Sequence, residues 1–188
     1  FMLAGKAFSW GINGSIWDSR STIERFNNPN KLLSAYYVGQ ELNEIWGYQT
    51  EGFFTSDADV AQHANQSFIK NSNNNIWLAG DLKFADLNGD GLINQGDNTL
   101  DNPGDRKVIG NLSPRYQYGF TLSGSWSGIG VSAFFQGIGK RDWYFAPEAG
   151  LFWGPYNRPY GYQPEKMMND IWTEENPDAY FPRYRGYT

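Results

Sequence analysis

The sequence has no cysteine and only one histidine, His63, in 188 residues. Without cysteine there can be no disulfide bond, no thiolate metal site and no cysteine nucleophile. A single histidine is too few for a multi-histidine zinc site or for most histidine-relay chemistry. No apolar run approaches the roughly 20 residues of a membrane-spanning helix. The sequence therefore lacks the chemistry of zinc enzymes, disulfide scaffolds and thiol catalysts.

Positive charge is also scarce. The 15 Lys and Arg residues against 20 Asp and Glu residues give a net charge of −5, and no basic block is present, so we expect no nucleic-acid partner. Apolar residues make up 40% of the chain, below the roughly 45–50% of ordinary soluble domains. Aromatic residues reach 18%, and 22 Gly and 9 Pro accompany them. This composition favours extended segments and turns over a helical bundle.

Three segments alternate between apolar and polar residues, which predicts β-strands at about residues 7–18, 115–126 and 131–137. The short connection at residues 127–130 contains two glycines and predicts a tight hairpin. The apolar faces carry Phe8, Trp10, Ile12, Ile16, Tyr116, Tyr118, Phe120, Leu122, Trp126, Val131, Ala133 and Phe135. The opposite faces carry mainly Ser, Gly, Asn, Gln and Thr.

Two all-β folds produce this pattern, a soluble sandwich and a transmembrane barrel. Strands of about ten residues match the roughly 9–11 residues that cross a bilayer at a tilt. Tyr and Trp lie toward the strand ends and Phe, Leu and Ile toward the middle, as in the outward face of a barrel with interfacial aromatic girdles. We therefore favour antiparallel strands of a transmembrane β-barrel, with long extracellular loops at about residues 20–113 and 138–188. Three strands cannot close a barrel, so we expect residues 1–188 to be a single fragment of a longer barrel domain.

The first long loop contains a calcium-binding pattern, DLNGDGLINQGD, at residues 86–97. Oxygen-bearing residues occupy positions 1, 3 and 5 of a twelve-residue loop, and Gly91 stands at position 6, where the chain must turn sharply. We expect Ile93, at position 8, to pack beneath the loop. The predicted ligands are Asp86, Asn88, Asp90, Leu92 through its backbone carbonyl, Asn94 and Asp97. The loop offers no open coordination position and no nearby base, so the expected Ca²⁺ is structural.

A metal-free turn held by Asx hydrogen bonds is the alternative for this loop. Asp97 replaces the usual Glu at position 12 and has a shorter arm. Neither flank has the pattern of an EF-hand helix, and the DNPGDR segment that follows is turn-forming.

Four segments together resemble the C-terminal third of SusC/RagA-type TonB-dependent transporters. They are GQELNEIWGYQTEGFF, GDLKFADLNGDGLIN, VIGNLSPRYQYGFTLSGSWSGIGVSAFFQG and WTEENPDAYFPRY. The resemblance covers nearly the whole chain from about residue 6. Its most specific parts are the DLNGDG loop and the SPRYQYGFTLSGSW strand at their observed separation. The turn SWSGIG differs from the amino-acid sequence that is frequent at this position in that family.

This resemblance implies a barrel of about 22 strands with an internal plug. It also implies location in the outer membrane of a Gram-negative, Bacteroidetes-like cell, surrounded by lipid. Such a transporter works with a SusD-like surface lipoprotein and imports oligosaccharides or peptides with energy from TonB. The plug and the TonB-contacting segment have no counterpart in this sequence.

A cluster of aromatic and polar residues in the second loop is the candidate substrate-binding site. Flat rings stack on sugar faces or peptide side chains, while amides and guanidinium groups form hydrogen bonds with them. The alternatives are packing between loops, or the interface with the lipoprotein lid. The candidates are Trp153, Tyr156, Asn157, Arg158 and Tyr160, with Tyr162 beside them.

We expect no enzyme, because the sequence contains no nucleophile elbow, phosphate loop or dinucleotide fingerprint. His63 lies in a short helical pattern and is expected to be a surface or partly packed residue. The favoured hypothesis is part of a nutrient importer. The alternative is a secreted, calcium-stabilised carbohydrate-binding module rich in β-structure. A glycoside hydrolase is a third and weaker hypothesis, since scattered carboxylates neither supply nor exclude a catalytic pair.

Overall fold

The computed structural model describes residues 2–5, 8–70, 76–145 and 164–184, with side chains from residue 8 onward. Over these residues the chain is an antiparallel all-β protein, as the sequence predicted, and the helices described are one or two turns long. The chain divides into two compact units. The first unit comprises Phe1–Glu24, Val38–Ile45 and Gly110–Trp143, and the second comprises Arg25–Tyr37, Trp46–Ile109 and Tyr144–Thr188.

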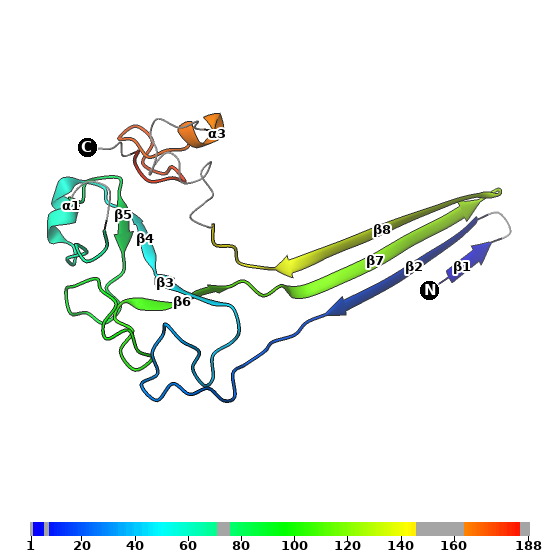
Figure 1. Ribbon diagram of the computed structural model, residues 1–188. Helices are drawn as coiled ribbons and strands as arrows, with labels where there is room; N and C mark the ends of the chain where they lie inside the picture. Colours follow the sequence, from blue (N-terminus) through cyan, green and yellow to red (C-terminus); the bar gives the residue numbers. More distant parts are fainter. Residues whose placement is uncertain (1, 6–7, 71–75, 146–163, 185–188) are drawn as a thin grey trace. The chain divides into compact units, whose positions relative to one another are not determined.

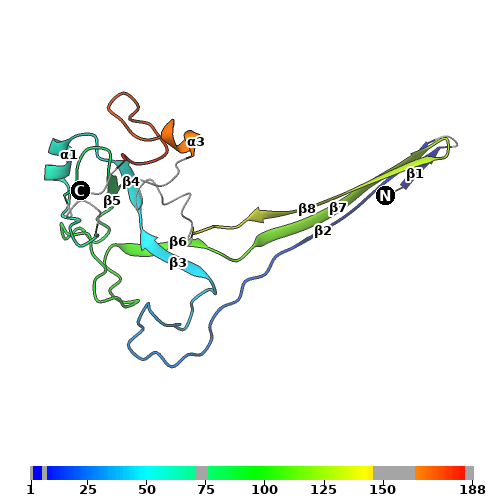
Figure 2. The ribbon, with the colours of Figure 1, turned by 45° about the horizontal axis from the view of Figure 1, so that its top comes forward.

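The first unit is built on a four-stranded antiparallel sheet in the order β1-β2-β7-β8 (Figures 1 and 2). The predicted segments 7–18 and 115–126 contain β2 and β7, while β1 was not foreseen. β8 begins two residues before the predicted segment and ends three residues after it. The strands are β1 (Met2–Gly5), β2 (Phe8–Trp17), β7 (Arg115–Trp126) and β8 (Ile129–Lys140).

The turn between β7 and β8 is tighter than the sequence indicated. Trp126 pairs with Ile129, so only Ser127 and Gly128 connect the strands. Both residues have positive φ, 48° and 87°, as a two-residue type I′ hairpin requires. Its backbone twist matches the twist of the strands that it joins.

Tyrosine rings from β7 extend the pairing of β8 past its predicted end. Gly137 pairs with Tyr118, whose ring fills the space that a side chain at residue 137 would need. Gly139 lies beside Tyr116, whose Cβ and backbone oxygen leave little room for a side chain at residue 139. The glycines of β8 hide the alternation in the sequence, although the strand continues as far as Lys140.

The strand register places the apolar residues of β2, β7 and β8 on one face. Ile12 pairs with Leu122, and Leu122 with Ala133. On the same face the rings of Phe120 and Phe135 stack, with centroids 4.8 Å apart and planes 16° from parallel. The opposite face carries mainly Ser, Gly, Asn, Thr and Gln, and its exceptions are Trp17, Arg115, Phe134, Ile138 and Lys140.

The second unit contains short strands and turns around its own core. β3 (Glu44–Tyr48) pairs with β6 (Arg106–Asn111), and β4 (Thr50–Phe53) pairs with β5 (Leu82–Phe84). The helices are α1 (Asp57–Gln62), whose N-cap Ser56 accepts the Asp59 amide, and α3 (Glu165–Met168). The buried side chains among the described residues all lie in this unit: Tyr37, Phe54, Gln66, Asp81, Ala85, Ile93, Asp105, Met167, Ile171, Trp172 and Ala179.

Candidate functional sites

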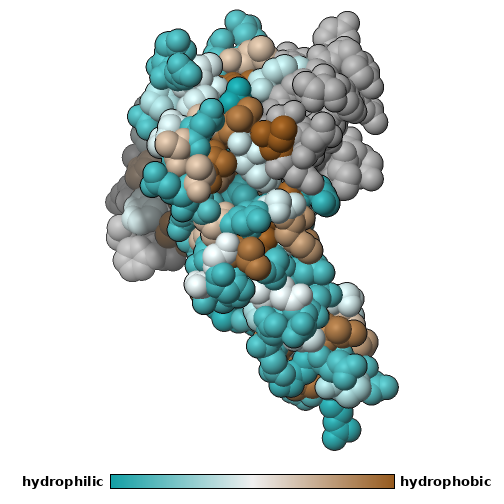
Figure 3. All heavy atoms as spheres, turned by 90° about the vertical axis from the view of Figure 1, so that its left-hand side faces the viewer, coloured by the Kyte–Doolittle hydropathy of each residue, from teal (hydrophilic) through white to brown (hydrophobic). Residues whose placement is uncertain are grey.

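The apolar face of the four-stranded sheet is exposed. Ile16 is 72% exposed, Trp126 62% and Val131 67%, although all three belong to the apolar side of the alternation. Figure 3 shows one face of the molecule, on which hydrophobic side chains (brown) lie at the surface between hydrophilic ones (teal). Large exposed apolar patches are typical of surfaces that contact a membrane, a ligand or a protein partner.

Along the strands, the exposed face changes in composition. Near the β7–β8 turn Phe8 pairs with Trp126, and at the other end Ile16 pairs with Tyr118. Between these pairs lie the aliphatic pair of Ile12 and Leu122 and the stacked rings of Phe120 and Phe135. Trp and Tyr thus flank a centre of Ile, Leu and Phe, which is the distribution found on the lipid-facing side of membrane barrels.

An ion pair holds β2 and β7 together where the first long loop begins and ends. Arg115 donates two hydrogen bonds, from Nε and Nη2, to the carboxylate of Asp18, each 2.5 Å long. This hydrogen bonding lowers the pKa of Asp18 from its ordinary 3.8 to about 2. The loop therefore leaves the sheet from a fixed point.

The predicted calcium loop is a series of side-chain-to-backbone hydrogen bonds. Asp86 accepts the amides of Gly89 and Gly91 at 2.7 and 2.9 Å. These hydrogen bonds, with that of Gly91 the strongest, lower the pKa of the Asp86 carboxyl. Asn88 accepts the amide of Asp90 at 3.0 Å, and Asp90 accepts the amide of Leu92 at 2.8 Å. Carboxylate and amide oxygens therefore line a curled backbone, which is the donor chemistry that Ca²⁺ prefers.

Two expectations about the loop backbone agree with the structure. Gly91 has φ of +80°, a conformation that favours glycine at the sharp turn. Ile93 is fully buried, and its amide donates to the carbonyl of Asn65 at 2.9 Å. The loop is thus anchored to the core through its eighth position.

The predicted closing ligand, Asp97, is engaged elsewhere in the structure. Its carboxylate accepts a 2.9 Å hydrogen bond from the side chain of Asn102. Among the residues that the structure describes, no three His, Cys, Asp or Glu side chains are grouped so that they could hold a metal ion together. The calcium assignment stays a prediction, and the donor set that fits it is led by Asp86, Asn88 and Asp90.

Asp105 is the residue of this region that sequence reasoning missed. It is fully buried, and its two carboxylate oxygens accept the amides of Leu87 and Asn94 at 2.9 and 2.8 Å. It thereby ties the start of the loop to its ninth position. The signal in the sequence is slight: Gly104–Asp105 is one of several Gly-Asp pairs and follows a turn that looked merely connective.

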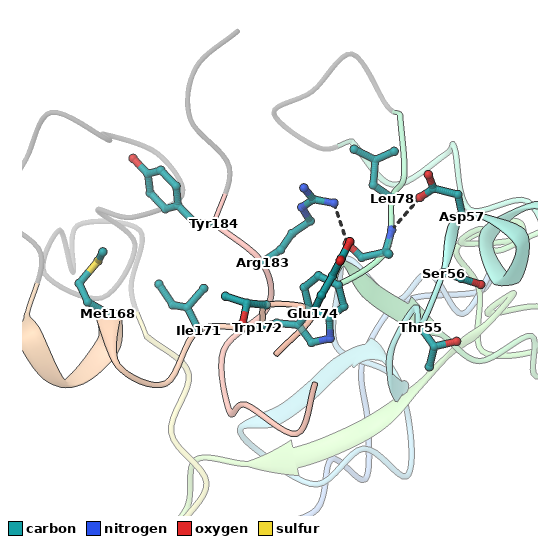
Figure 4. Close-up of a pocket in the computed structure, with 12 residues that line it drawn as sticks. Thr55, Ser56, Asp57, Leu78, Met168, Ile171, Trp172, Glu174, Arg183 and Tyr184 are labelled. Carbon is teal, nitrogen blue, oxygen red and sulfur yellow. Dashed lines mark hydrogen bonds between the residues drawn. The ribbon is translucent and has the colours of Figure 1, made fainter. Parts of the chain in front are cut away.

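A pocket of about 830 Å³ lies in the second unit, and we name it the Trp172 pocket. Its apolar wall consists of Leu78, Met168, Ile171 and Trp172 (Figure 4). The indole ring of Trp172 packs against the backbone of Gly80, where φ is +83° and a side chain would collide with the ring. Trp172 is only 8% exposed.

Charged and hydroxyl groups form the rest of the Trp172 pocket. Arg183 donates from Nη1 to the carbonyl of Ala79 at 2.8 Å, and Asp57 accepts the amide of Ala79 at 3.2 Å (dashed lines in Figure 4). Glu174 has no ion-pair or hydrogen-bond partner among the described residues. The phenol of Tyr184 also borders the pocket.

The other residues singled out in the sequence fall in different places. His63 is half-buried at the end of α1, where its Nε2 lies 2.8 Å from the carbonyl of Phe84 and its ring packs edge-on against Phe54. The predicted substrate-binding residues lie outside the described residues: Trp153, Tyr156, Asn157, Arg158, Tyr160 and Tyr162.

No protein-family model matches the chain, and no curated protein matches it. None of the helices in the described ranges is long or apolar enough to cross a membrane. The class that the fold defines is an antiparallel all-β protein.

Proposed function

We propose that this chain is part of an outer-membrane nutrient importer of the SusC/RagA type. In this proposal β1, β2, β7 and β8 belong to the wall of a transmembrane barrel, and residues 20–113 are an extracellular loop. The observation that carries the proposal is the exposed apolar face, with Trp126 toward one end, Tyr118 toward the other, and Ile12 and Leu122 between them. The small polar residues of the other face suit a hydrated lumen.

The partners follow from the same proposal. The importer takes up an oligosaccharide or a peptide together with a SusD-like lipoprotein, and parts of the barrel outside this sequence contact TonB. The chain has no catalytic role in this scheme.

Dependence on detergent tests the proposal. The 188-residue chain should aggregate in buffer and become monodisperse in detergent micelles, because its apolar sheet face then contacts hydrocarbon. Light scattering with and without detergent is the measurement. A monodisperse chain in buffer alone would refute the barrel wall and favour the alternative, a secreted carbohydrate-binding module. The core around Phe54 and Ile93 in the second unit is the observation that favours this alternative.

We also propose that the loop at residues 86–97 binds a structural Ca²⁺. Its ligands are the six residues predicted from the spacing: Asp86, Asn88, Asp90, Leu92 through its carbonyl, Asn94 and Asp97. The fit rests on the curled backbone that the first three side chains already hold.

Removal of calcium and of one ligand tests this site. EDTA should speed proteolysis within residues 86–97, and added Ca²⁺ should restore protection, because the ion joins donors from the whole loop. Asp90→Ala should lower calcium affinity, whereas Asp101→Ala, at an exposed residue outside the loop, should not. If neither EDTA nor Ca²⁺ changes the rate of proteolysis within residues 86–97, the loop is a metal-free turn.

A further inference from the structure

We propose that the Trp172 pocket binds a short free peptide that carries an apolar side chain next to a positive charge. Every residue that lines the pocket belongs to the second unit. The inference rests on the proposed function, in which a peptide is one of two candidate substrates, and it deepens that function by naming a site and a ligand chemistry; the site itself does not include the four-stranded sheet.

The size and the wall of the pocket fit such a ligand. A volume of about 830 Å³ lies within the roughly 300–1,000 Å³ of small-molecule sites. Leu78, Ile171 and Met168 supply aliphatic and thioether groups that suit an apolar amino-acid side chain. Met168 is half exposed, so its flexible side chain is accessible to a ligand.

The same wall argues against a sugar ring as the occupant. Stacking on a sugar needs an open aromatic face. The indole of Trp172 is 8% exposed and lies against Gly80, so it forms part of the wall and offers no open platform.

The charges of the pocket favour a positive ligand. Asp57 and Glu174 contribute two carboxylates and Arg183 one guanidinium, and both Asp57 and Arg183 are already bonded to the backbone of Ala79. Glu174 has no partner among the described residues, so its carboxylate is available to an ammonium group.

The three methionines of the chain provide a direct test. Met168 borders the pocket, Met167 is buried beside it, and Met2 lies in β1. In a chain labelled with ¹³C at the methionine methyl groups, the tripeptide Lys-Leu-Lys should shift the Met168 signal and leave the Met2 signal unchanged. Glu-Leu-Glu keeps the apolar side chain and should bind more weakly, and the neutral disaccharide maltose should cause no shift.

A matched pair of variants tests the role of charge. Glu174→Gln should weaken Lys-Leu-Lys binding by about two- to fivefold, the effect of one partly exposed ion pair. Glu175→Gln, next in the chain but not part of the pocket wall, should leave binding unchanged. The proposal would be overturned if the two tripeptides bind equally or if the two variants have the same effect. It would also be overturned if the Met168 signal responds to maltose in place of the peptides, or does not shift at all. Because the readout is a signal from the second unit, such a failure is distinct from a failure of the detergent test.

Discussion

The two units of the chain treat their apolar residues in opposite ways. The second unit buries Phe54 and Ile93 to 1% and 0% exposure, whereas the sheet of the first unit leaves Ile16 and Val131 more than half exposed. Burial of apolar surface away from water stabilises a folded chain. The second unit supplies its own interior for its apolar side chains, whereas the sheet leaves many of its apolar side chains uncovered by the described residues. In the proposed importer, lipid covers this exposed face, and the comparison teaches that the two units can be tested separately for what covers their apolar residues.

The largest expected effect is the loss of a core ring. Phe54→Ala should lower the free energy of unfolding of the second unit by about 3–5 kcal/mol, because the cavity it leaves is surrounded by packed side chains. Phe135→Ala removes the same ring from the sheet, where Phe135 is 46% exposed and stacks on Phe120. With both variants in the same detergent micelles, its cost should be about 0.5–1.5 kcal/mol, the contribution of one aromatic pair. Denaturant unfolding of both variants makes the comparison, and equal costs would contradict the contrast between the units.

A charge on the apolar face should reveal the medium that covers it. Leu122→Arg should destabilise the sheet in lipid bilayers by about 2–4 kcal/mol, since Leu122 lies at the aliphatic centre of the face. Thr121→Arg, one residue away on the polar face, should cost far less. Urea titration in vesicles is the measurement. If Thr121→Arg costs as much as Leu122→Arg, the assignment of lipid and water to the two faces is wrong.

A smaller effect is expected from the buried carboxylate of the loop. Asp105→Ala should cost about 1–3 kcal/mol, because the amides of Leu87 and Asn94 lose their acceptor. Asp101→Ala is the control, since Asp101 is exposed and pairs only with Lys31 at the surface. Thermal unfolding of both variants should separate them, and equal melting temperatures would show that Asp105 does not hold the loop.

The smallest effect concerns the ion pair at the end of β2. The pKa of Asp18 is lowered from 3.8 to about 2 in the folded chain, so its contribution is complete above pH 4 or so. It is lost as the pH falls through the folded pKa near 2. Asp18→Asn should therefore unfold at a lower temperature than the parent chain at pH 6, and the difference should vanish near pH 2. If the difference in unfolding temperature does not change with pH, the ionisation of Asp18 is not its cause.

The strands of the sheet could be predicted because apolar and polar residues alternate along them, and this local pattern places the two kinds of residue on opposite faces. The last residues of β8 were harder to predict, since Gly137 and Gly139 carry no side chain and Tyr118 and Tyr116 of the neighbouring strand fill the space. The small strands β3 to β6 were hidden inside a long loop. They are held mainly by pairing and by a few core residues, and leave little periodicity.

The loop at residues 86–97 also has features that the sequence predicts and one contact that it does not. The spacing of Asp86, Asn88 and Asp90 and the glycine turn are local, so the sequence indicates them directly. Asp105 lies eleven residues beyond Asn94 and reaches it only because the chain folds back, as Gly96 and Gly104 pack backbone against backbone. No local rule links these positions.

By itself, the amino-acid sequence determined the two-faced strands, the tight hairpin after Trp126 and the oxygen-rich loop, because each depends on neighbours within a few residues. Only the tertiary structure decided that Asp105 closes the loop, that Asp18 pairs with Arg115, and that Leu78, Trp172 and Arg183 border one pocket. These contacts join residues far apart in the chain, and their existence depends on packing that no short stretch of sequence encodes.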